Sequence, residues 1–513
     1  MSVITEQPQM VVSPRRMWFV LFGLIAGMFV AILDQTVFGT ALPTIVGELH
    51  GIEHMLWVIT AYSLASTIML PISGKLGDIV GHKRLFVISI FVFVVGSIIG
   101  GIAPNMTWLI VGRAIQGIGG GGLMIQAISV LSHLVPPSET RKYTPFFGLT
   151  FGISSVVGPL VGGWFSSIGQ WRWVFWMNIP VGVIAVTAVT LLVPKLPVRT
   201  VRQKFDYVGI LFLSMASTAI VLTTSWGGSM YTWNSPVIIL LIVGAVLCGI
   251  AFIGFEYIAD DPLMPLSLFK NRNFAVVTIA GLVLGLVMMG VLAYLPTYIQ
   301  MVAGASPTMS GVYMLPMVVG MLVVSVVVNV IIARTGRYKW APLSGMVVMG
   351  VSLVLLNTMT SSMSMWHFYV YLGVMGVGMG MTMQTLMLVV RNESPLALMG
   401  TANATNTYFR TMGMTLGASV IGSIFVSRLQ DQIAYRLPGV PIGSSGHESL
   451  TPAVIDTLPS AVREAVIASY SDALTPIFLW IVPLVVFAFV VLLALKEKPL
   501  RTTLDHEDAP ALM

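Results

Sequence analysis

The chain has 513 residues, of which 56% are hydrophobic and 9% are charged, whereas soluble domains carry about a quarter charged residues. With a mean hydropathy of +0.91, this composition indicates a polytopic membrane protein rather than a soluble domain. The net charge of +6 does not indicate nucleic-acid binding, because the sequence has no basic and aromatic surface domain. The single cysteine, Cys248, excludes an internal disulfide framework and a cysteine-based metal site.

Fourteen apolar segments are long enough to cross a membrane, since a span needs roughly twenty residues. They must be helices, because unpaired backbone groups are too costly in lipid. The first segment is too long for a signal peptide, so we expect it to be the first span. The predicted spans are 17–39, 56–74, 85–103, 108–131, 145–166, 173–193, 207–225, 235–255, 274–298, 310–333, 341–357, 367–390, 402–427 and 474–495.

Basic residues are distributed unevenly between the two sides of these spans. If the N-terminus lies inside the cell, 20 of the 26 Lys and Arg residues fall in cytoplasmic segments. Positive charge favours the cytoplasmic side. We therefore expect a multi-pass protein of a bacterial cell membrane with both termini in the cytoplasm.

The spans divide as six, two and six. Charged, proline-containing segments follow the sixth span and precede the ninth. We expect an N-terminal six-helix bundle (1–193), a linker with two spans (194–273), a C-terminal six-helix bundle (274–495) and a cytoplasmic tail (496–513). An outer loop, 428–473, contains Leu458, Val462, Val466 and Tyr470 at helical spacing. We interpret it as a short amphipathic helix at the outer face. A role as a lid or spacer is favoured over a role as a binding domain.

Asp34 is the acidic residue that falls deep inside a predicted span. A charge at the centre of a bilayer costs at least about 2.5–3.5 kcal/mol. A carboxyl group escapes that cost by taking up a proton or by pairing with a cation. Either property makes Asp34 a candidate proton carrier.

Arg113 is the candidate partner for Asp34. Each residue lies about five residues below the outer end of its span, at roughly 8 Å depth, so the two meet if the first and fourth spans are neighbours. One alternative is a static pair that joins two helices. We favour proton coupling, in which a cationic substrate competes with the proton for Asp34. Replacing Asp34 with Asn should then abolish pH-driven transport and leave insertion intact.

Two glycine-containing segments are candidates for moving parts. In the fifth span, Gly148 and Gly152, then Gly158 and Gly162, allow close helix contact, and Pro159 permits a kink. The loop between spans 2 and 3 reads GKLGDIVGHKR. We interpret it as a cytoplasmic latch in which Asp78 faces Lys75, His82, Lys83 and Arg84, in preference to a basic turn alone.

These motifs together resemble the major facilitator superfamily, in particular its fourteen-span drug:proton antiporter branch (the EmrB/QacA subfamily). The matching segments are LDQTVFGTALP, GKLGDIVGHKR, RAIQGIGGG, GPLVGGWF and WRWVFWMNIPVG, with further similarity at 263–274, 294–300 and 403–425. The resemblance implies two six-helix bundles around a central cavity, two inserted helices, and alternating access driven by protons.

The resemblance also implies roles for individual residues. It implies proton coupling by Asp34 and Arg113, with Gln116 and Gly117 in the same motif. It implies gating by Asp78, together with Gly74, Gly81, Lys83 and Arg84, and an antiporter helix formed by Gly158, Pro159, Gly162 and Gly163. The second-half copy of the gating loop, 329–340, has Asn329 where glycine is expected and lacks an aspartate, so gating is expected to depend mainly on the first half.

Methionine-rich spans 10 and 12 are typical of an adaptable apolar cavity, although packing or lipid contact explains such residues equally well. The candidate cavity residues are Trp57, Tyr62, Gln126, Asn178, Tyr294, Tyr298, Gln300, Gln384 and Arg410.

The sequence thus favours a proton-driven multidrug exporter of lipophilic and cationic compounds, with export of an endogenous metabolite or lipid as the alternative. A membrane enzyme is disfavoured, because we find no nucleophile–base pair and no P-loop. We expect no metal and no cofactor besides the proton gradient. The expected partners are a small-molecule substrate, protons and the bilayer. The sequence leaves the substrate, the proton stoichiometry, the oligomeric state and accessory proteins undetermined.

Overall fold

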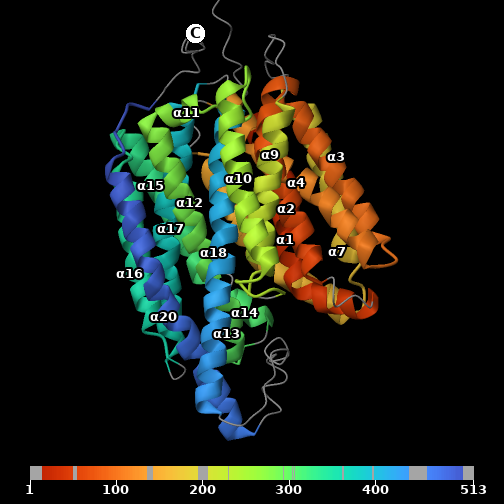
Figure 1. Ribbon diagram of the computed structural model, residues 1–513. Helices are drawn as coiled ribbons and strands as arrows, with labels where there is room; N and C mark the ends of the chain where they lie inside the picture. Colours follow the sequence, from red (N-terminus) through yellow and green to blue (C-terminus); the bar gives the residue numbers. More distant parts are fainter. Residues whose placement is uncertain are drawn as a thin grey trace, which may run out of the picture.

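The computed structural model is built of α-helices, most of which run side by side along one direction (Figure 1). This confirms the predicted all-α class. The structure describes residues 14–49, 55–135, 142–194, 206–228, 230–292, 294–302, 304–305, 307–360, 363–395, 398–437 and 459–500.

The helices follow the chain in three groups. The first group contains α1 (Pro14–Leu49), α2 (Met55–Val80), α3 (His82–Gly101), α4 (Met106–Leu134), α6 (Thr144–Ser167), α7 (Trp173–Trp176) and α8 (Asn178–Leu192). Two helices follow, α9 (Tyr207–Trp226) and α10 (Pro236–Ile258). The last group contains α11 (Ser267–Lys270), α12 (Arg272–Leu292), α13 (Leu295–Val302), α14 (Pro307–Tyr313), α15 (Leu315–Thr335), α16 (Trp340–Asn357), α17 (Met365–Glu393), α18 (Met399–Arg436) and α20 (Ser460–Leu493).

The number of long apolar helices agrees with the sequence. Within the described residues, 13 helices are long and apolar enough to cross a membrane. The remaining predicted span, 145–166, corresponds to α6, a helix of 24 residues. The basic loop between α2 and α3 marks one end of the bundle, which we name the predicted cytoplasmic end; the opposite end is the predicted outer end.

The first helix continues beyond the predicted span. The membrane-spanning segment ends at Phe38, close to the expected end near residue 39, but α1 continues to Leu49. Leu42, Ile45 and Val46 recur at helical spacing and are buried in a core shared with α2, α4 and α7. Packing of this apolar face therefore extends the helix beyond the length that a bilayer requires.

The predicted separate helix in the outer loop is also wrong for the described residues. α18 continues to Arg436, and residues 460–470 form the first turns of α20, so they are continuous with the last span. Both helices extend beyond their neighbours at the lower end of Figure 1. Val466 and Tyr470 are buried in the core of the C-terminal helices, which explains why this segment continues the span. Leu458 lies outside the described residues.

The two larger groups of helices have separate hydrophobic cores. One core contains residues between 268 and 495, and two others contain residues between 17 and 193. The buried methionines of α15 and α17, among them Met317, Met321, Met375 and Met379, belong to the C-terminal core. Packing within that core therefore accounts for these methionines.

The two halves touch where α2 and α4 pack against α18 and where α6 packs against α14 and α15. The inserted helix α9 packs against both α2 and α18, and α10 packs against α9; Figure 1 shows α9 and α10 beside that junction. The six-two-six division remains a prediction, and its boundary at 273 falls within α12.

Candidate functional site

Asp34 lies in α1 with 0% of its surface exposed. Its Oδ2 atom accepts a hydrogen bond from Arg113 of α4, with which it forms an ion pair. Its Oδ1 atom accepts hydrogen bonds from Asn178 Nδ2 at 2.9 Å and from Gln116 Nε2 at 3.1 Å. All of these contacts place a donor against an oxygen of the carboxyl group, so its acceptor sites are occupied in this conformation.

The structure therefore brings together the two residues whose equal depth predicted a contact. Gln116, which the motif resemblance implicated, joins them. Asn178, which we predicted as a cavity residue, belongs to this network instead. Ser97 of α3 completes it by accepting hydrogen bonds from Gln116 at 2.8 Å and from Asn178 at 3.2 Å. Sequence reasoning missed Ser97, since a serine in an apolar helix gives no distinctive signal.

Two aromatic rings enclose the guanidinium group of Arg113. Its central carbon lies 4.0 Å from the centre of the Phe38 ring and 4.3 Å from the centre of the Tyr62 ring. The Tyr62 hydroxyl donates to the carbonyl oxygen of Ala31, one turn before Asp34 in α1. Ring faces attract cations, and these rings also separate the ion pair from solvent. Residues of α1, α2 and α4 therefore hold Asp34 and Arg113 together.

Glycines in α4 allow this arrangement. A Cβ atom on Gly117 would lie 2.5 Å from the carbonyl oxygen of Tyr62 in α2, and one on Gly121 would lie 2.3 Å from that of Ser66. On the other face, a Cβ atom on Gly112 would lie 2.8 Å from the backbone nitrogen of Gly100 in α3. Because α4 has no side chains at these positions, it packs directly on both neighbours, and Arg113 reaches α1.

The predicted antiporter helix, α6, contacts α1 beside Asp34. A Cβ atom on Gly158 would lie 2.0 Å from Thr36 Oγ1, and the Thr36 hydroxyl donates to the carbonyl oxygen of Ser154 at 2.9 Å. Gly162 is buried, whereas a Cβ atom on Gly163 would meet no atom within 4 Å. The side chain of Pro159 lies outside the described residues. The segment is one uninterrupted helix.

Gly148 and Gly152 of α6 face the other half of the molecule. A Cβ atom on Gly148 would lie 3.0 Å from Gln384 Nε2 of α17, and one on Gly152 would lie 2.3 Å from Val318 Cγ1 of α15. The glycines of α6 therefore serve two contacts, one between halves and one with α1.

Asp78 connects the two halves at the predicted cytoplasmic end. Its Oδ2 atom accepts hydrogen bonds from the amide of Thr401 at 3.0 Å and from its hydroxyl at 2.6 Å. Its Oδ1 atom lies 3.2 Å from His82 Nε2. Gln126, which we predicted as a cavity residue, lies 2.7 Å from His82 Nδ1 through its Oε1 atom. The hydrogen bonds from Thr401 hold the ends of α2 and α18 together, and His82 and Gln126 extend the network to α3 and α4.

Small residues let the same ends approach closely. A Cβ atom on Gly74 would lie 2.4 Å from Ala404 Cβ and 2.9 Å from the carbonyl oxygen of Gly400. Gly81, between α2 and α3, has a φ of 99°, a conformation that other residues rarely adopt. Gly74 thus allows the close contact with α18, and Gly81 allows the turn between α2 and α3.

The basic residues that we expected to face Asp78 have other positions. Lys75 is buried and pairs with Asp261 between α10 and α11. Lys83 donates to the carbonyl oxygens of Thr190 and Val193 at the end of α8, at 2.8 and 2.5 Å, where helical carbonyls lack intrahelical partners. Arg84 is exposed. Of the predicted latch, the structure therefore brings His82 to Asp78.

The remaining cavity candidates do not converge on one site. Trp57 packs edge-on against Trp226, with 5.6 Å between ring centres. Tyr294 donates to the carbonyl oxygen of Ala418 at 2.7 Å, Tyr298 lies 3.3 Å from Ser471 Oγ, and Gln300 donates to Ser310 Oγ at 3.0 Å, all near α13 at the predicted outer end. Gln384 and Arg410 are buried within α17 and α18.

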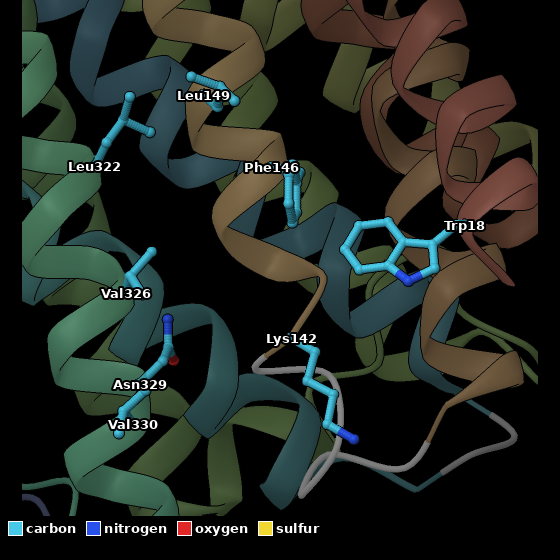
Figure 2. A pocket seen from close by; sticks show the side chains of 8 residues that line it. All are labelled: Trp18, Lys142, Phe146, Leu149, Leu322, Val326, Asn329 and Val330. Carbon is cyan, nitrogen blue, oxygen red and sulfur yellow. The ribbon is translucent and has the colours of Figure 1, made fainter. Parts of the chain in front are cut away.

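A groove of about 470 Å³ lies between α6 and α15, near the predicted cytoplasmic end. Figure 2 shows the α15 side chains on one side and Phe146, Trp18 and Lys142 on the other. Sequence analysis missed it; Lys142 before an apolar span and Asn329 within one were the available signals. The lining residues are Trp18, Lys142, Phe146, Leu149, Leu322, Val326, Asn329 and Val330.

Comparison with protein families gives a match over most of the chain. Residues 24–418 match the model of the Major Facilitator Superfamily, a range that includes Asp34, Arg113, Asp78 and Thr401. The chain belongs to the Major Facilitator Superfamily. It is therefore a multi-pass membrane transporter for a small-molecule substrate, and not an enzyme.

Similar members of the superfamily include multidrug transporters. An uncharacterized MFS-type transporter of Mycobacterium tuberculosis is 37% identical over 507 residues, covering 98% of this chain and 72% of the relative. The multidrug transporter protein MdtP of Bacillus subtilis is 33% identical over 468 residues, covering 89% and 86%. Multidrug resistance protein 3 of Bacillus subtilis is 30% identical over 496 residues, covering 95% and 96%.

Solved structures of the superfamily share the fold. The human organic anion transporter MFSD10 matches with a TM-score of 0.61 and 12% identity, covering 94% of this chain and 100% of the other. The proton:xylose symporter XylE matches with a TM-score of 0.61 and 13% identity, covering 95% and 98%. At such low identity these matches show the fold alone.

Proposed function

We propose that this chain is a proton-coupled exporter of lipophilic compounds, in the fourteen-span drug:proton antiporter branch of the superfamily. The two Bacillus subtilis multidrug proteins and the motifs of α1, α4 and α6 support this proposal. The excess of basic residues at one end supports a location in the bacterial cell membrane with both termini in the cytoplasm.

The observation that carries the proposal is that Asp34 is fully buried and is bound by Arg113, Gln116 and Asn178. A carboxylate with 0% exposure costs several kcal/mol to bury unless it is paired and hydrogen-bonded. Here Arg113, Gln116 and Asn178 compensate for that cost. A proton on Asp34 would remove the charge that holds these donors, so α1 would separate from α4 and α8. Asp34 is therefore suited to couple protonation to helix rearrangement.

The closed contact between Asp78 and Thr401 gives this conformation a place in an antiport cycle. With the predicted cytoplasmic end closed by Asp78 and Thr401, we assign this conformation to the step that follows substrate release to the outside and precedes proton uptake. Proton uptake by Asp34 then favours the opposite conformation, from which the proton leaves to the cytoplasm and a new substrate binds.

The groove between α6 and α15 favours a second candidate, the export of an endogenous lipid or other amphiphilic metabolite. Its lining is mainly apolar, and Lys142 lies beside it. An amphiphile in the cytoplasmic leaflet would contact both features. The same proton chemistry at Asp34 would serve this candidate.

The experiment is transport in proteoliposomes with an imposed pH gradient and a panel of neutral and charged lipophilic dyes. We expect dye accumulation that follows the pH gradient, is lost with a protonophore, and is lost in Asp34→Asn although that variant inserts normally. Accumulation of dyes without dependence on pH would contradict proton coupling. Proton-driven movement of an added amphiphilic lipid, with no movement of any dye, would favour the second candidate.

A further inference from the structure

One face of α18 carries polar side chains through the membrane-spanning part of the helix. Asn403, Asn406, Thr407 and Arg410 stand at positions i, i+3, i+4 and i+7, which share one face of a helix. Their exposed fractions are 4%, 7%, 2% and 6%. A buried polar face in a membrane helix is costly unless its groups have partners.

Most donors on this face lack an acceptor among the described residues. Within the part of the chain that the structure describes, Asn403 Nδ2 has no hydrogen-bond partner, and we find no hydrogen bond, ion pair or aromatic ring for the guanidinium of Arg410. Asn406 Nδ2 makes one long hydrogen bond to Thr278 Oγ1, at 3.4 Å. The face therefore offers positive charge and N–H groups without a protein counter-ion.

The acidic residues of the membrane helices are already occupied or lie at helix ends. Asp34 is bound to Arg113. Glu393, at the end of α17, accepts from Asn271, Asn273 and Lys498 at 2.6–2.8 Å. In the described helices after α12, the other acids lie near the predicted outer end, where Asp472 pairs with Arg436. Arg410 thus has no acid in the described membrane helices left to neutralise it.

The helix dipole can stabilise the buried Arg391, but it cannot stabilise Arg410. Arg391 also lacks an acidic partner among the described residues, but it lies in the last turn of α17, where the helix dipole favours a cation. Arg410 lies in the interior of α18. Its carbonyl oxygen would be 2.1 Å from a Cβ atom on Gly285, in the middle of α12.

Arg410 lies well inside α18, away from the predicted cytoplasmic end. It lies nine residues after Thr401, about 13 Å along α18 from the closed contact with Asp78. Substrate sites of such transporters lie near the middle of the membrane, between the two halves. A ligand at this depth would be enclosed on the predicted cytoplasmic side in the present conformation.

We propose that Arg410, with Asn403, binds an acidic group of the transported compound, so that the substrates are lipophilic anions such as carboxylates or sulfonates. The inference rests on the proposed export function and specifies its substrate class. The acid supplies the counter-charge and acceptors that α18 lacks, and the apolar part of the compound contacts the surrounding apolar helices. A guanidinium group suits this task because it binds carboxylate or sulfonate oxygens through paired N–H groups.

The test uses two dyes built on the same xanthene ring, fluorescein, which is an anion, and rhodamine 123, which is a cation. Binding to the purified full-length protein is followed by fluorescence anisotropy. We expect Arg410→Gln to raise the Kd for fluorescein at least about tenfold and to leave that for rhodamine 123 within about twofold. Arg410→Lys should retain part of the fluorescein affinity, because it keeps the charge but loses the paired N–H groups. Arg436→Gln, on the same helix, is the matched control and should change neither Kd.

Several results would overturn the inference. They are equal effects of Arg410→Gln on both dyes, no effect on either, or binding of rhodamine 123 alone by the unaltered protein. If Arg410→Gln fails to fold by size-exclusion chromatography, Asn403→Leu replaces it, with a smaller selective loss of fluorescein expected and an unselective change contradicting the proposal. Proton-driven transport of rhodamine 123 by the same variants tests the proposed function separately, because binding of fluorescein needs no gradient.

The direction of charge movement gives a second readout. Exchange of an exported anion for incoming protons moves more positive charge inward than exchange of a cation for the same protons. In proteoliposomes with valinomycin and a potassium gradient, a potential negative on the predicted cytoplasmic side should therefore accelerate fluorescein export. Fluorescein export that is insensitive to the potential would contradict the assignment.

Discussion

Asp78 at the end of α2 caps the first turn of α18 by accepting hydrogen bonds from both the amide and the hydroxyl of Thr401. A carboxylate at the N-terminus of a helix is favoured by the helix dipole, and here the carboxylate and the helix belong to different halves of the protein. Closure of the predicted cytoplasmic end is therefore stabilised by a contact that disappears when the halves separate.

Asp78→Asn should shift the protein towards opening at this end. The variant loses charge-assisted hydrogen bonds, which contribute about 1.5–3 kcal/mol, so we expect the open population to rise at least about tenfold. Double electron–electron resonance measures this opening. The spin labels are placed at the exposed positions Arg84 and Arg334 in a Cys248→Ser background. An unchanged distance distribution would show that Asp78 does not hold the closed state.

The glycines of α6 should differ sharply in their tolerance of a methyl group. Gly158→Ala places a Cβ atom against Thr36, two residues from Asp34, whereas Gly163→Ala meets no atom within 4 Å. Overpacking costs about 1–3 kcal/mol, so we expect Gly158→Ala to lower proton-driven dye transport about tenfold or more and Gly163→Ala to change it less than about twofold. Equal sensitivity of the two positions would be inconsistent with a specific contact between α6 and α1.

Burial of Asp34 and Arg113 could be anticipated from the sequence, but most partners of the buried polar groups could not. Asp34 and Arg113 were paired correctly, because an acid and a base inside apolar spans at equal depth have few other ways to be accommodated. Asn178 and Thr401 were assigned elsewhere or missed, because their neighbours depend on how distant helices pack. The extension of α1 to Leu49 was missed for the same reason, since core packing and not bilayer thickness fixes its end.

The ion pair Lys75–Asp261 should stabilise the contact between α2 and the segment that follows α10. Lys75 is 2% exposed, and the side chain of Asp261 is 22% exposed. Removing one partner of a buried pair costs about 3–5 kcal/mol, and the partial exposure of Asp261 reduces that cost. We expect Lys75→Ala to lower the thermal unfolding midpoint in detergent, and the exchanged pair Lys75→Asp with Asp261→Lys to recover at least about half of the loss. A doubly altered protein no more stable than Lys75→Ala would argue against direct pairing.

Glu48 provides a pH-dependent contact near the end of α1. Hydrogen bonds from Arg172 and Trp171 hold the pKa of Glu48 below its usual range, with distances of 2.5 and 2.7 Å. The stabilisation is fully present above the unfolded-state pKa, about 4.3, and is lost as the pH falls through the lowered folded-state value. Because both charged side chains are partly exposed, the contribution is below about 1 kcal/mol.

Glu48→Gln should therefore slightly lower the unfolding midpoint at neutral pH, and the difference from the unaltered protein should shrink at pH 3, which is about one unit below the usual carboxyl pKa. Thermal unfolding in detergent at both pH values measures this. If the difference in unfolding midpoint grew on acidification, its sign would be opposite to the expected one, and Glu48 would not stabilise the protein through this contact.

The most direct test of proton coupling at Asp34 is proton movement driven by a dye gradient. Proteoliposomes containing a trapped pH indicator receive an outward gradient of the dye that the transport panel identifies, with no initial pH difference. The unaltered protein and Asp431→Asn, which changes an exposed acid of α18, should take protons up into the lumen as dye leaves. Asp34→Asn should show no dye-dependent pH change. Normal proton uptake by Asp34→Asn would contradict the central claim.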